Sequence, residues 1–156
     1  TNFRSRLWTA EAARPVIEKA AREASILKTS AEDCAALLGL SAPSDIARHF
    51  LALGSAAVIV TLGRDGVFFA SSEASEHVAG LTVAAVDATG AGDAFTGALL
   101  SAHARGLPLA EAVRFANAAA ALSTQGYGAI APLPTRSAVE AVLRNGPPVD
   151  LDQGPA

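Results

Sequence analysis

A carboxylate follows a glycine-rich turn in residues 87–97, which read Asp-Ala-Thr-Gly-Ala-Gly-Asp-Ala-Phe-Thr-Gly. Gly90 and Gly92 permit a tight turn with close backbone approach, and residues 94–104 have the composition of a helix. The unpaired amides and the positive dipole end of such a helix favour a phosphate at the turn. Asp93 would stand beside that anion as a general base for a substrate hydroxyl. These features predict a phosphoryl-transfer site.

A purely structural interpretation of these residues stays open, because acidic residues favour any first helical turn and glycines favour any strand-to-helix turn. Two nucleotide motifs are excluded. A Walker P-loop requires Lys and Ser/Thr after its last glycine, whereas Gly92 is followed by Asp93 and Ala94. The dinucleotide-binding fingerprint fails because Phe95 occupies the position of its third glycine.

The longer string resembles the second signature of the ribokinase-like (PfkB) sugar kinases, in which Gly-Ala-Gly-Asp opens a helix of small and apolar residues. Ala88 departs from the residues usual at its position in that signature. The resemblance implies that Asp93 is the catalytic base. It also implies that the amides of Ala91, Gly92 and Asp93, directly after Gly90, form the anion hole. ATP and Mg²⁺ are then the expected cofactors, since kinases use Mg²⁺ to neutralise phosphate charge.

Residues 58–69 read as a buried strand, a glycine-containing turn and a returning strand. They look like the Thr-Leu-Gly-x-x-Gly hairpin on the nucleotide side of these kinases. The resemblance therefore implies nucleotide contacts at Thr61, Gly63 and Gly66. Any β-hairpin could have the same pattern, so the structural alternative stays open here.

Asn117 interrupts an alanine-rich helix, and Gly128 lies in the Gly-Tyr-Gly-Ala sequence that follows it. The resemblance implies that both residues contact the nucleotide, with Asn117 beside the adenine. A buried Asn bonded to neighbouring backbone is the alternative. The loop of Gly128 resembles one that binds a monovalent cation in many family members, which implies K⁺ near Asp87.

Ser30 and Asp33 occupy the place of an Asn-x-x-Glu segment that helps hold Mg²⁺ and its waters in the family. The resemblance makes Ser30 a nucleotide-side residue and Asp33 a ligand to the metal through water. Ser30 is equally a good helix N-cap followed by acidic residues in the first turn. Both interpretations stand at this point.

The first residues, Asn-Phe-Arg-Ser-Arg-Leu-Trp, look like a segment of 2-keto-3-deoxygluconate kinases and of some fructokinases. The resemblance implies that Arg4 meets the substrate, where a guanidinium suits the carboxylate of a sugar acid. A solvated basic residue before a helix is the plain alternative. We expect 2-keto-3-deoxygluconate as substrate. A fructokinase, a ribokinase-type enzyme and a non-catalytic nucleotide- or sugar-binding fragment are the alternatives.

The formal charge of −3, with 12 basic residues scattered through 156, offers no footprint for nucleic acid. No apolar stretch approaches the ~20 residues of a membrane span. The one cysteine, Cys34, cannot form an internal disulfide, which favours a cytoplasmic protein, and we interpret it as a packing residue. His49, His77 and His103 lack metal-ligand spacing.

The pattern predicts helices near 9–24, 31–39, 43–53, 91–104, 108–123 and 135–143, with strands near 25–28, 56–61, 66–70 and 82–86. This alternation predicts an α/β fold, and the resemblance makes it a ribokinase-like three-layer α/β/α sandwich. Family members are longer, so we expect residues 1–144 to be the C-terminal part of such a domain, without the lid and first strands. Residues 145–156 are expected to form a flexible tail. We expect a small sugar or sugar acid as the binding partner. We also expect the full-length protein to form homo-oligomers.

Overall fold

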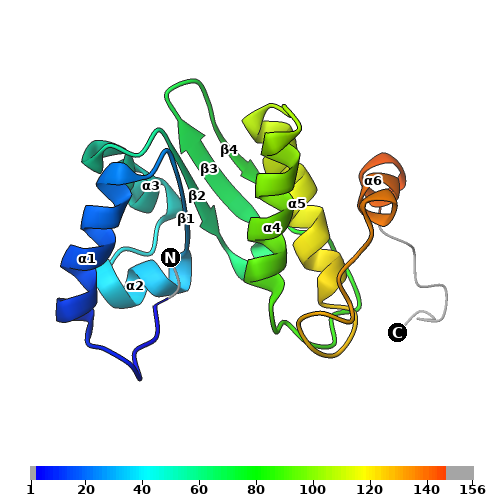
Figure 1. Cartoon of the computed structure of the whole chain (residues 1–156), viewed down its shortest axis with the longest axis horizontal. Coiled ribbons are helices and arrows are strands. Elements are labelled where there is room, and N and C mark those ends of the chain that lie inside the picture. The colour runs from blue at the N-terminus through cyan, green and yellow to red at the C-terminus, as the bar shows by residue number, and fades with distance from the viewer. Residues whose placement is uncertain (1–2, 147–156) are drawn as a thin grey trace. The chain divides into compact units, whose positions relative to one another are not determined.

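The computed structural model describes residues 3–146, which divide after Gly80 into two compact units (Figure 1). The first unit contains α1 (Ala10–Glu23), β1 (Ile26–Ser30), α2 (Ala31–Leu38), α3 (Pro43–Leu53), β2 (Ala57–Thr61), the 3₁₀ turn η1 (Gly63–Asp65), β3 (Val67–Ser71) and β4 (Ser75–Val78). The second contains α4 (Ala91–Ala104), α5 (Leu109–Ser123) and α6 (Arg136–Asn145). All six predicted helices are confirmed, with bounds that differ by at most two residues from those expected.

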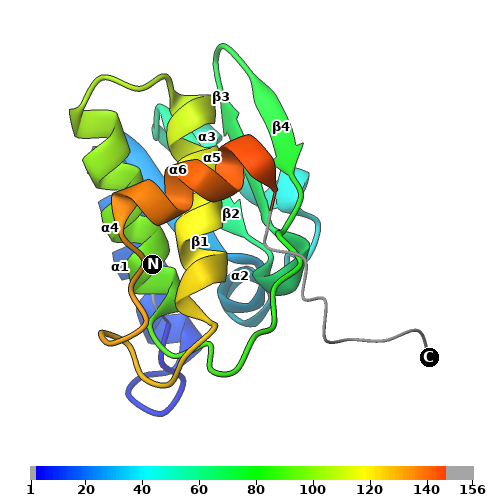
Figure 2. The same cartoon turned by 90° about the vertical axis from the view of Figure 1, so that its right-hand side faces the viewer.

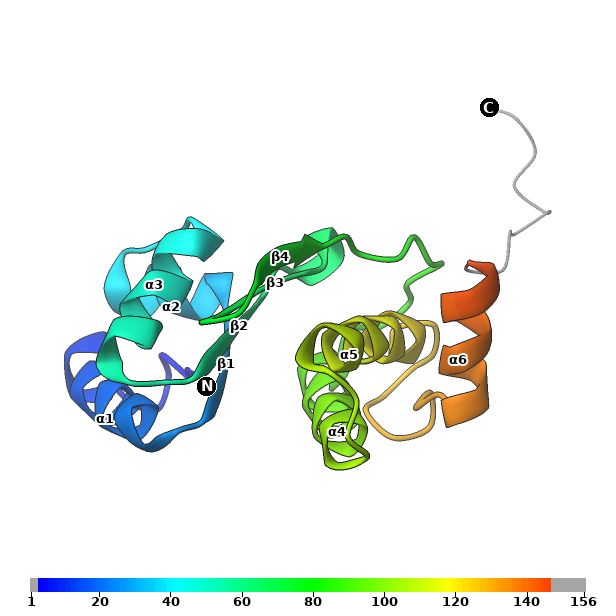
Figure 3. The ribbon, with the colours of Figure 1, turned by 90° about the horizontal axis from the view of Figure 1, so that it is seen from above.

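The first unit is a four-stranded sheet in the order β1-β2-β3-β4. The β1 and β2 strands are parallel, with Ser30 opposite Thr61, and the β2–β3 and β3–β4 pairs are antiparallel. Helices α1 to α3 lie on one face of this sheet (Figure 3). Their core contains Phe50 and Ile46 of α3 packed with Val58 and Val60 of β2, which share one face because strand side chains alternate.

Local chemistry sets the helix boundaries of the first unit. The Thr9 side chain accepts a hydrogen bond from the Ala12 amide at the start of α1, and Ser30 does the same for Asp33 in α2. Such caps satisfy backbone amides that have no acceptor within the helix. Gly39 ends α2 in the left-handed conformation, with φ of 71°.

The second unit packs α4 against α5, and α6 crosses α5 (Figure 2). Gly106, with φ of 84°, ends the turn after α4, and Pro108 precedes α5. The Thr135 side chain caps α6 by accepting from the Ala138 amide. The sequence pattern predicts both the cap of α6 and the separation of α4 from α5 by Gly106 and Pro108.

The predicted strand at 82–86 is wrong. The Ala85 amide donates to the Val83 carbonyl, which closes a tight turn, and the amides of Val86 and Asp87 both donate to Thr124. A strand requires a neighbour to complete its ladder, and residues 82–86 have none in the described part of the chain. The sequence pattern predicts that Asp87 follows a strand, but in the structure it does not.

The edge strand β4, Ser-Glu-His-Val, was not predicted because it is polar and short. Its pairing with β3 makes it a strand. The predicted tail at 145–156 begins one residue too early, since Asn145 is still in α6 and Gly146 caps that helix. Residues 147–156 lie outside the described residues.

Candidate active site

The predicted turn before α4 is present, and its first glycine is required by packing. Gly90 adopts φ of 78°, in the left-handed region that favours glycine. A Cβ at this position would lie 2.6 Å from the Cβ of Ala129. The close approach expected at Gly90 is therefore made to the loop after α5.

The amides at the start of α4 are the candidate anion hole. The Ala91 amide donates to Ala88 over 3.1 Å, and the Asp93 amide donates to Gly90 over 3.0 Å. The Gly92 amide has no backbone acceptor among the described residues. An anion at this helix end would meet one uncommitted amide, two amides that must share their bonds, and the positive end of the helix dipole.

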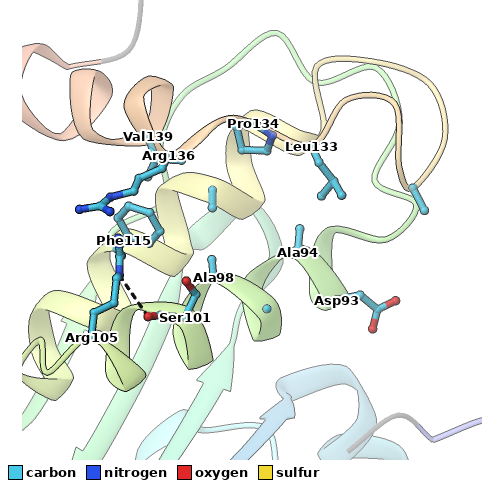
Figure 4. A pocket seen from close by; sticks show the side chains of 13 residues that line it. Asp93, Ala94, Ala98, Ser101, Arg105, Phe115, Leu133, Pro134, Arg136 and Val139 are labelled. Carbon is cyan, nitrogen blue, oxygen red and sulfur yellow. Dashed lines mark hydrogen bonds between the residues drawn. The ribbon is translucent and has the colours of Figure 1, made fainter.

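Asp93 lies in the first turn of α4, with an exposed side chain. It marks one end of a groove of about 420 Å³ that runs along α4 towards Arg105 (Figure 4). Its carboxylate points away from the Arg105 end of that groove. The side chain is thus accessible, as a base that meets a substrate hydroxyl must be, but its carboxylate does not point into the groove.

Asp87 and Gly128, 41 residues apart, are brought together as the predicted cation site requires. One Asp87 oxygen accepts the Gly128 amide over 2.9 Å, and the other accepts the Thr89 amide over 2.9 Å. The Thr89 hydroxyl, and next the Gly128 amide, lower the pKa of the Asp87 carboxyl. A cation here would have to share carboxylate oxygens that already accept two amides.

The predicted hairpin is present in the first unit. Thr61 ends β2, and its hydroxyl donates to the Thr29 carbonyl over 3.2 Å. Gly63 and Gly66 bound the turn with φ of 63° and 96°. A Cβ at Gly66 would lie 2.2 Å from the Val78 carbonyl oxygen, and one at Gly80 would lie 2.0 Å from the Arg64 oxygen. The two glycines allow the turn and the end of β4 to touch.

The segment that carries Ser30 and Asp33 has the capping geometry. The Ser30 hydroxyl oxygen accepts the Asp33 amide over 3.1 Å, and an Asp33 oxygen accepts the Phe3 amide over 3.2 Å. Within residues 3–146, no group of three or more His, Cys, Asp or Glu side chains could hold a metal ion. These side chains therefore do not form a dedicated Mg²⁺ cage. Arg4 is exposed in the first unit and follows Phe3, whose amide donates to Asp33.

The remaining candidates, Asn117 and Cys34, are buried. Asn117 is 7% exposed within α5, as the structural alternative expects. Cys34 is fully buried and reduced, and its sulfur contacts the Thr29 hydroxyl at 3.2 Å. Burial raises the pKa of this thiol, so the interpretation of Cys34 as a packing residue is confirmed. No described helix is long and apolar enough to cross a membrane.

Sequence reasoning missed Ala129, Gly80 and the groove residues Arg105, Phe115 and Arg136. Arg105 stacks over the Phe115 ring at 5.3 Å and donates to the Ser101 carbonyl. Only the small-residue spacing of α4 was available in the sequence to indicate a groove. The contacts of Ala129 and Gly80 depend on segments distant in sequence, so no local pattern reports them.

Comparison with known proteins gives a consistent set of similarities. Residues 1–136 match the model of the pfkB family carbohydrate kinases. A ribokinase from Staphylococcus aureus is 39% identical over 99 residues, which are 63% of this chain and 33% of that protein. A fructokinase from Vibrio alginolyticus is 32% identical over 143 residues, 87% of this chain and 47% of that protein.

Among solved structures, aminoimidazole riboside kinase from Salmonella enterica, in complex with aminoimidazole riboside and an ATP analogue, is similar with a TM-score of 0.82. It is 35% identical, over 92% of this chain and 50% of that chain. The similarity confirms the predicted ribokinase-like α/β fold. The chain spans between a third and a half of the length of these proteins. None of the three is named a 2-keto-3-deoxygluconate kinase, so that narrower resemblance is not shown.

Proposed function

The chain belongs to the pfkB family of carbohydrate kinases, and we propose that it is part of an enzyme that transfers the γ-phosphoryl group of ATP to a primary hydroxyl of a small sugar or sugar acid. The observation that carries the proposal is the start of α4, where an accessible carboxylate follows a left-handed glycine at a helix N-terminus. A base and an anion-binding end are thus held within one helical turn. Relatives named as sugar kinases agree with this chemistry.

In the proposed reaction, Asp93 accepts the proton of the substrate hydroxyl. The hydroxyl oxygen forms a bond to the γ-phosphorus, and the bond from that phosphorus to the bridging oxygen of ADP breaks. The Gly92 amide and the α4 dipole stabilise negative charge on the transferring group. Mg²⁺, bound mainly to the ATP phosphates, would neutralise charge there. Thr61, Gly63, Gly66 and Asn117 are our proposed nucleotide contacts. We further propose that the nucleotide contacts Ser30 and Gly128, that Mg²⁺ binds Asp33 through water, and that a monovalent cation binds at Asp87.

Asp93→Asn tests the assignment, measured as ATP-dependent phosphorylation in the complete enzyme by coupled detection of ADP. Turnover should fall at least ~100-fold, the usual effect of removing a general base, with nucleotide affinity nearly retained. Asp45→Asn is the control, since Asp45 is an exposed acid of α3 that forms an ion pair with Arg48. Normal turnover in Asp93→Asn would refute the role of Asp93.

The sugar is a narrower proposal. We favour a sugar acid such as 2-keto-3-deoxygluconate because exposed Arg4 offers a guanidinium that suits a carboxylate. Relatives named ribokinase and fructokinase favour a neutral sugar equally well. A panel of 2-keto-3-deoxygluconate, ribose, fructose and aminoimidazole riboside separates these substrates. Selectivity for the acid that disappears in Arg4→Ala supports the acid; preference for ribose or fructose excludes it.

A further inference from the structure

The turn that joins β2 to β3, at residues 62–66, is exposed over its three central residues, from Gly63 to Asp65. Inside the turn, the Leu62 amide donates to the Gly66 carbonyl over 2.8 Å, and the Gly66 amide donates to the Gly63 carbonyl over 3.2 Å. Both glycines have positive φ, a conformation that glycine adopts easily and also leaves easily, because no Cβ restricts it. A fixed conformation of this turn therefore benefits from contacts outside it.

One such contact comes from the side chain of His77 in the edge strand β4. His77 pairs with Phe68 of β3, and its ring Nε2 lies 2.9 Å from the carbonyl oxygen of Asp65, the last residue of η1. A carbonyl oxygen can only accept, so Nε2 is the donor, as it is in both the Nε2–H tautomer and the protonated ring. The hydrogen bond ties the exposed turn to a strand 12 residues away in sequence.

The orientation of one peptide group connects His77 to both glycines of the turn. Because a peptide is planar, fixing the Asp65 carbonyl also fixes the direction of the Gly66 N–H, which donates to Gly63. The backbone after β4 packs on the same turn, since a Cβ at Gly66 would lie 2.5 Å from the Gly80 nitrogen. Packing limits how near the two segments come, whereas the hydrogen bond from His77 also favours one orientation of the carbonyl.

We propose that His77 is a positioning residue for the nucleotide. Its ring holds the peptide between Asp65 and Gly66, and through it the hydrogen bond from Gly66 to Gly63, in the conformation that binds ATP. The inference rests on the proposed function, which makes Gly63 and Gly66 nucleotide contacts. A turn that is ordered before binding loses less conformational entropy when the nucleotide arrives. His77 therefore contributes to the affinity for ATP and not to the chemical step.

The test compares His77→Ala with His77→Gln in the complete enzyme, with the Kd of ATP in the presence of Mg²⁺ measured by calorimetry without sugar. His77→Ala should raise this Kd about 3- to 10-fold, the range for one net hydrogen bond, and leave kcat at saturating ATP unchanged. His77→Gln should restore most of the affinity, because the glutamine side chain also offers an N–H donor. Ser75→Ala is the matched control, since Ser75 is exposed on the same face of β4.

Hydrogen exchange of the Leu62 and Gly66 amides, measured without nucleotide, tests the contact itself. Both amides should exchange at least ~3-fold faster in His77→Ala and near the wild-type rate in His77→Gln, with the amides of β2 as the reference for global stability. Unchanged exchange in His77→Ala would overturn the proposal, as would faster exchange with an unchanged Kd for ATP. Equal loss of affinity in His77→Gln and His77→Ala would also overturn it.

Neither calorimetry without sugar nor hydrogen exchange depends on Asp93 or on phosphoryl transfer. A wild-type enzyme that binds ATP with the expected response to His77→Ala, but phosphorylates no sugar, would refute the proposed reaction and support the role of His77. The two failures are therefore distinguishable.

Discussion

Gly90→Ala separates the two physical demands on the turn before α4. The substitution forces alanine into φ of 78°, where an L-residue costs about 1–2 kcal/mol. It also places a methyl group 2.6 Å from the Cβ of Ala129, an overlap of the kind that costs typically about 1–3 kcal/mol. We therefore expect the second unit to lose about 2–5 kcal/mol of stability. Small domains have only about 5–15 kcal/mol in total, so this is a large loss.

Three comparison variants divide that loss into its parts. Gly106 has φ of 84°, and no atom lies within 4 Å of the position that a methyl group would take there, so Gly106→Ala should show the left-handed conformational loss alone. Gly97 is helical with open space around it, and Gly97→Ala should stabilise the unit by about 0.5–1 kcal/mol. The double variant Gly90→Ala/Ala129→Gly removes the overlap, although the new glycine changes backbone freedom in its own loop.

Hydrogen exchange of the slowest amides in α4 and α5 measures these changes within the second unit. Far-UV circular dichroism in urea reports the accompanying helix loss. The reasoning is refuted if Gly90→Ala is no less stable than Gly106→Ala, since contact with Ala129 would then contribute nothing. It is also refuted if the double variant recovers none of the loss beyond that of Gly106→Ala.

Two further perturbations test contacts of the site. Asp87→Asn should speed exchange of the Gly128 amide at pH 7, because the amide loses a charged acceptor; unchanged exchange would contradict the contact. The folded pKa of Asp87 is depressed, so its contribution is fully present above the unfolded value of about 3.9 and is lost as pH falls through the lower folded value. Exchange of Gly128 relative to its intrinsic rate should therefore be flat near neutral pH and rise only below about pH 4, whereas a midpoint near pH 6 would exclude Asp87 as the cause. Gly66→Ala should destabilise β3 and β4 more than Gly63→Ala, since a methyl group at Gly66 would lie 2.2 Å from the Val78 oxygen and Gly63 has open space. If the amides of β3 and β4 exchanged at the same rates in Gly66→Ala as in Gly63→Ala, that result would contradict the tight contact at Gly66.

The helices could be predicted because their signals are local. Ser30 and Thr135 cap the following helices by bonds to amides three residues away, and Gly39 and Gly106 end helices in conformations that glycine adopts easily. The first three strands were found for a similar reason, since β2 is a run of buried β-branched residues followed by a glycine turn. Each of these signals lies within a few residues of its effect.

Strand formation at 82–86 and at β4 was misjudged because pairing is a property of two segments. The apolar run at 82–86 has the composition of a strand, but its neighbouring amides bond to Thr124. The polar segment at 75–78 has little strand composition, but β3 offers it a ladder. Side-chain pattern alone cannot tell whether a partner edge is present.

The candidate site shows the same distinction within a single motif. Sequence spacing correctly predicts that Asp93 stands in the first turn of a helix after glycine, because that arrangement is local. It predicts a close backbone approach at Gly90 without naming the segment that makes it, and the structure places Ala129, 39 positions later, in that space. Gly92 differs, since its φ is not positive and its amide has no backbone acceptor in the described chain. Gly90 thus packs against the loop after α5, which the hydrogen bond from the Gly128 amide to Asp87 also holds. Gly92 leaves an amide donor at the start of α4. The motif thus serves packing at one glycine and leaves a backbone donor without a backbone acceptor at the other, so the two glycines have separate physical roles.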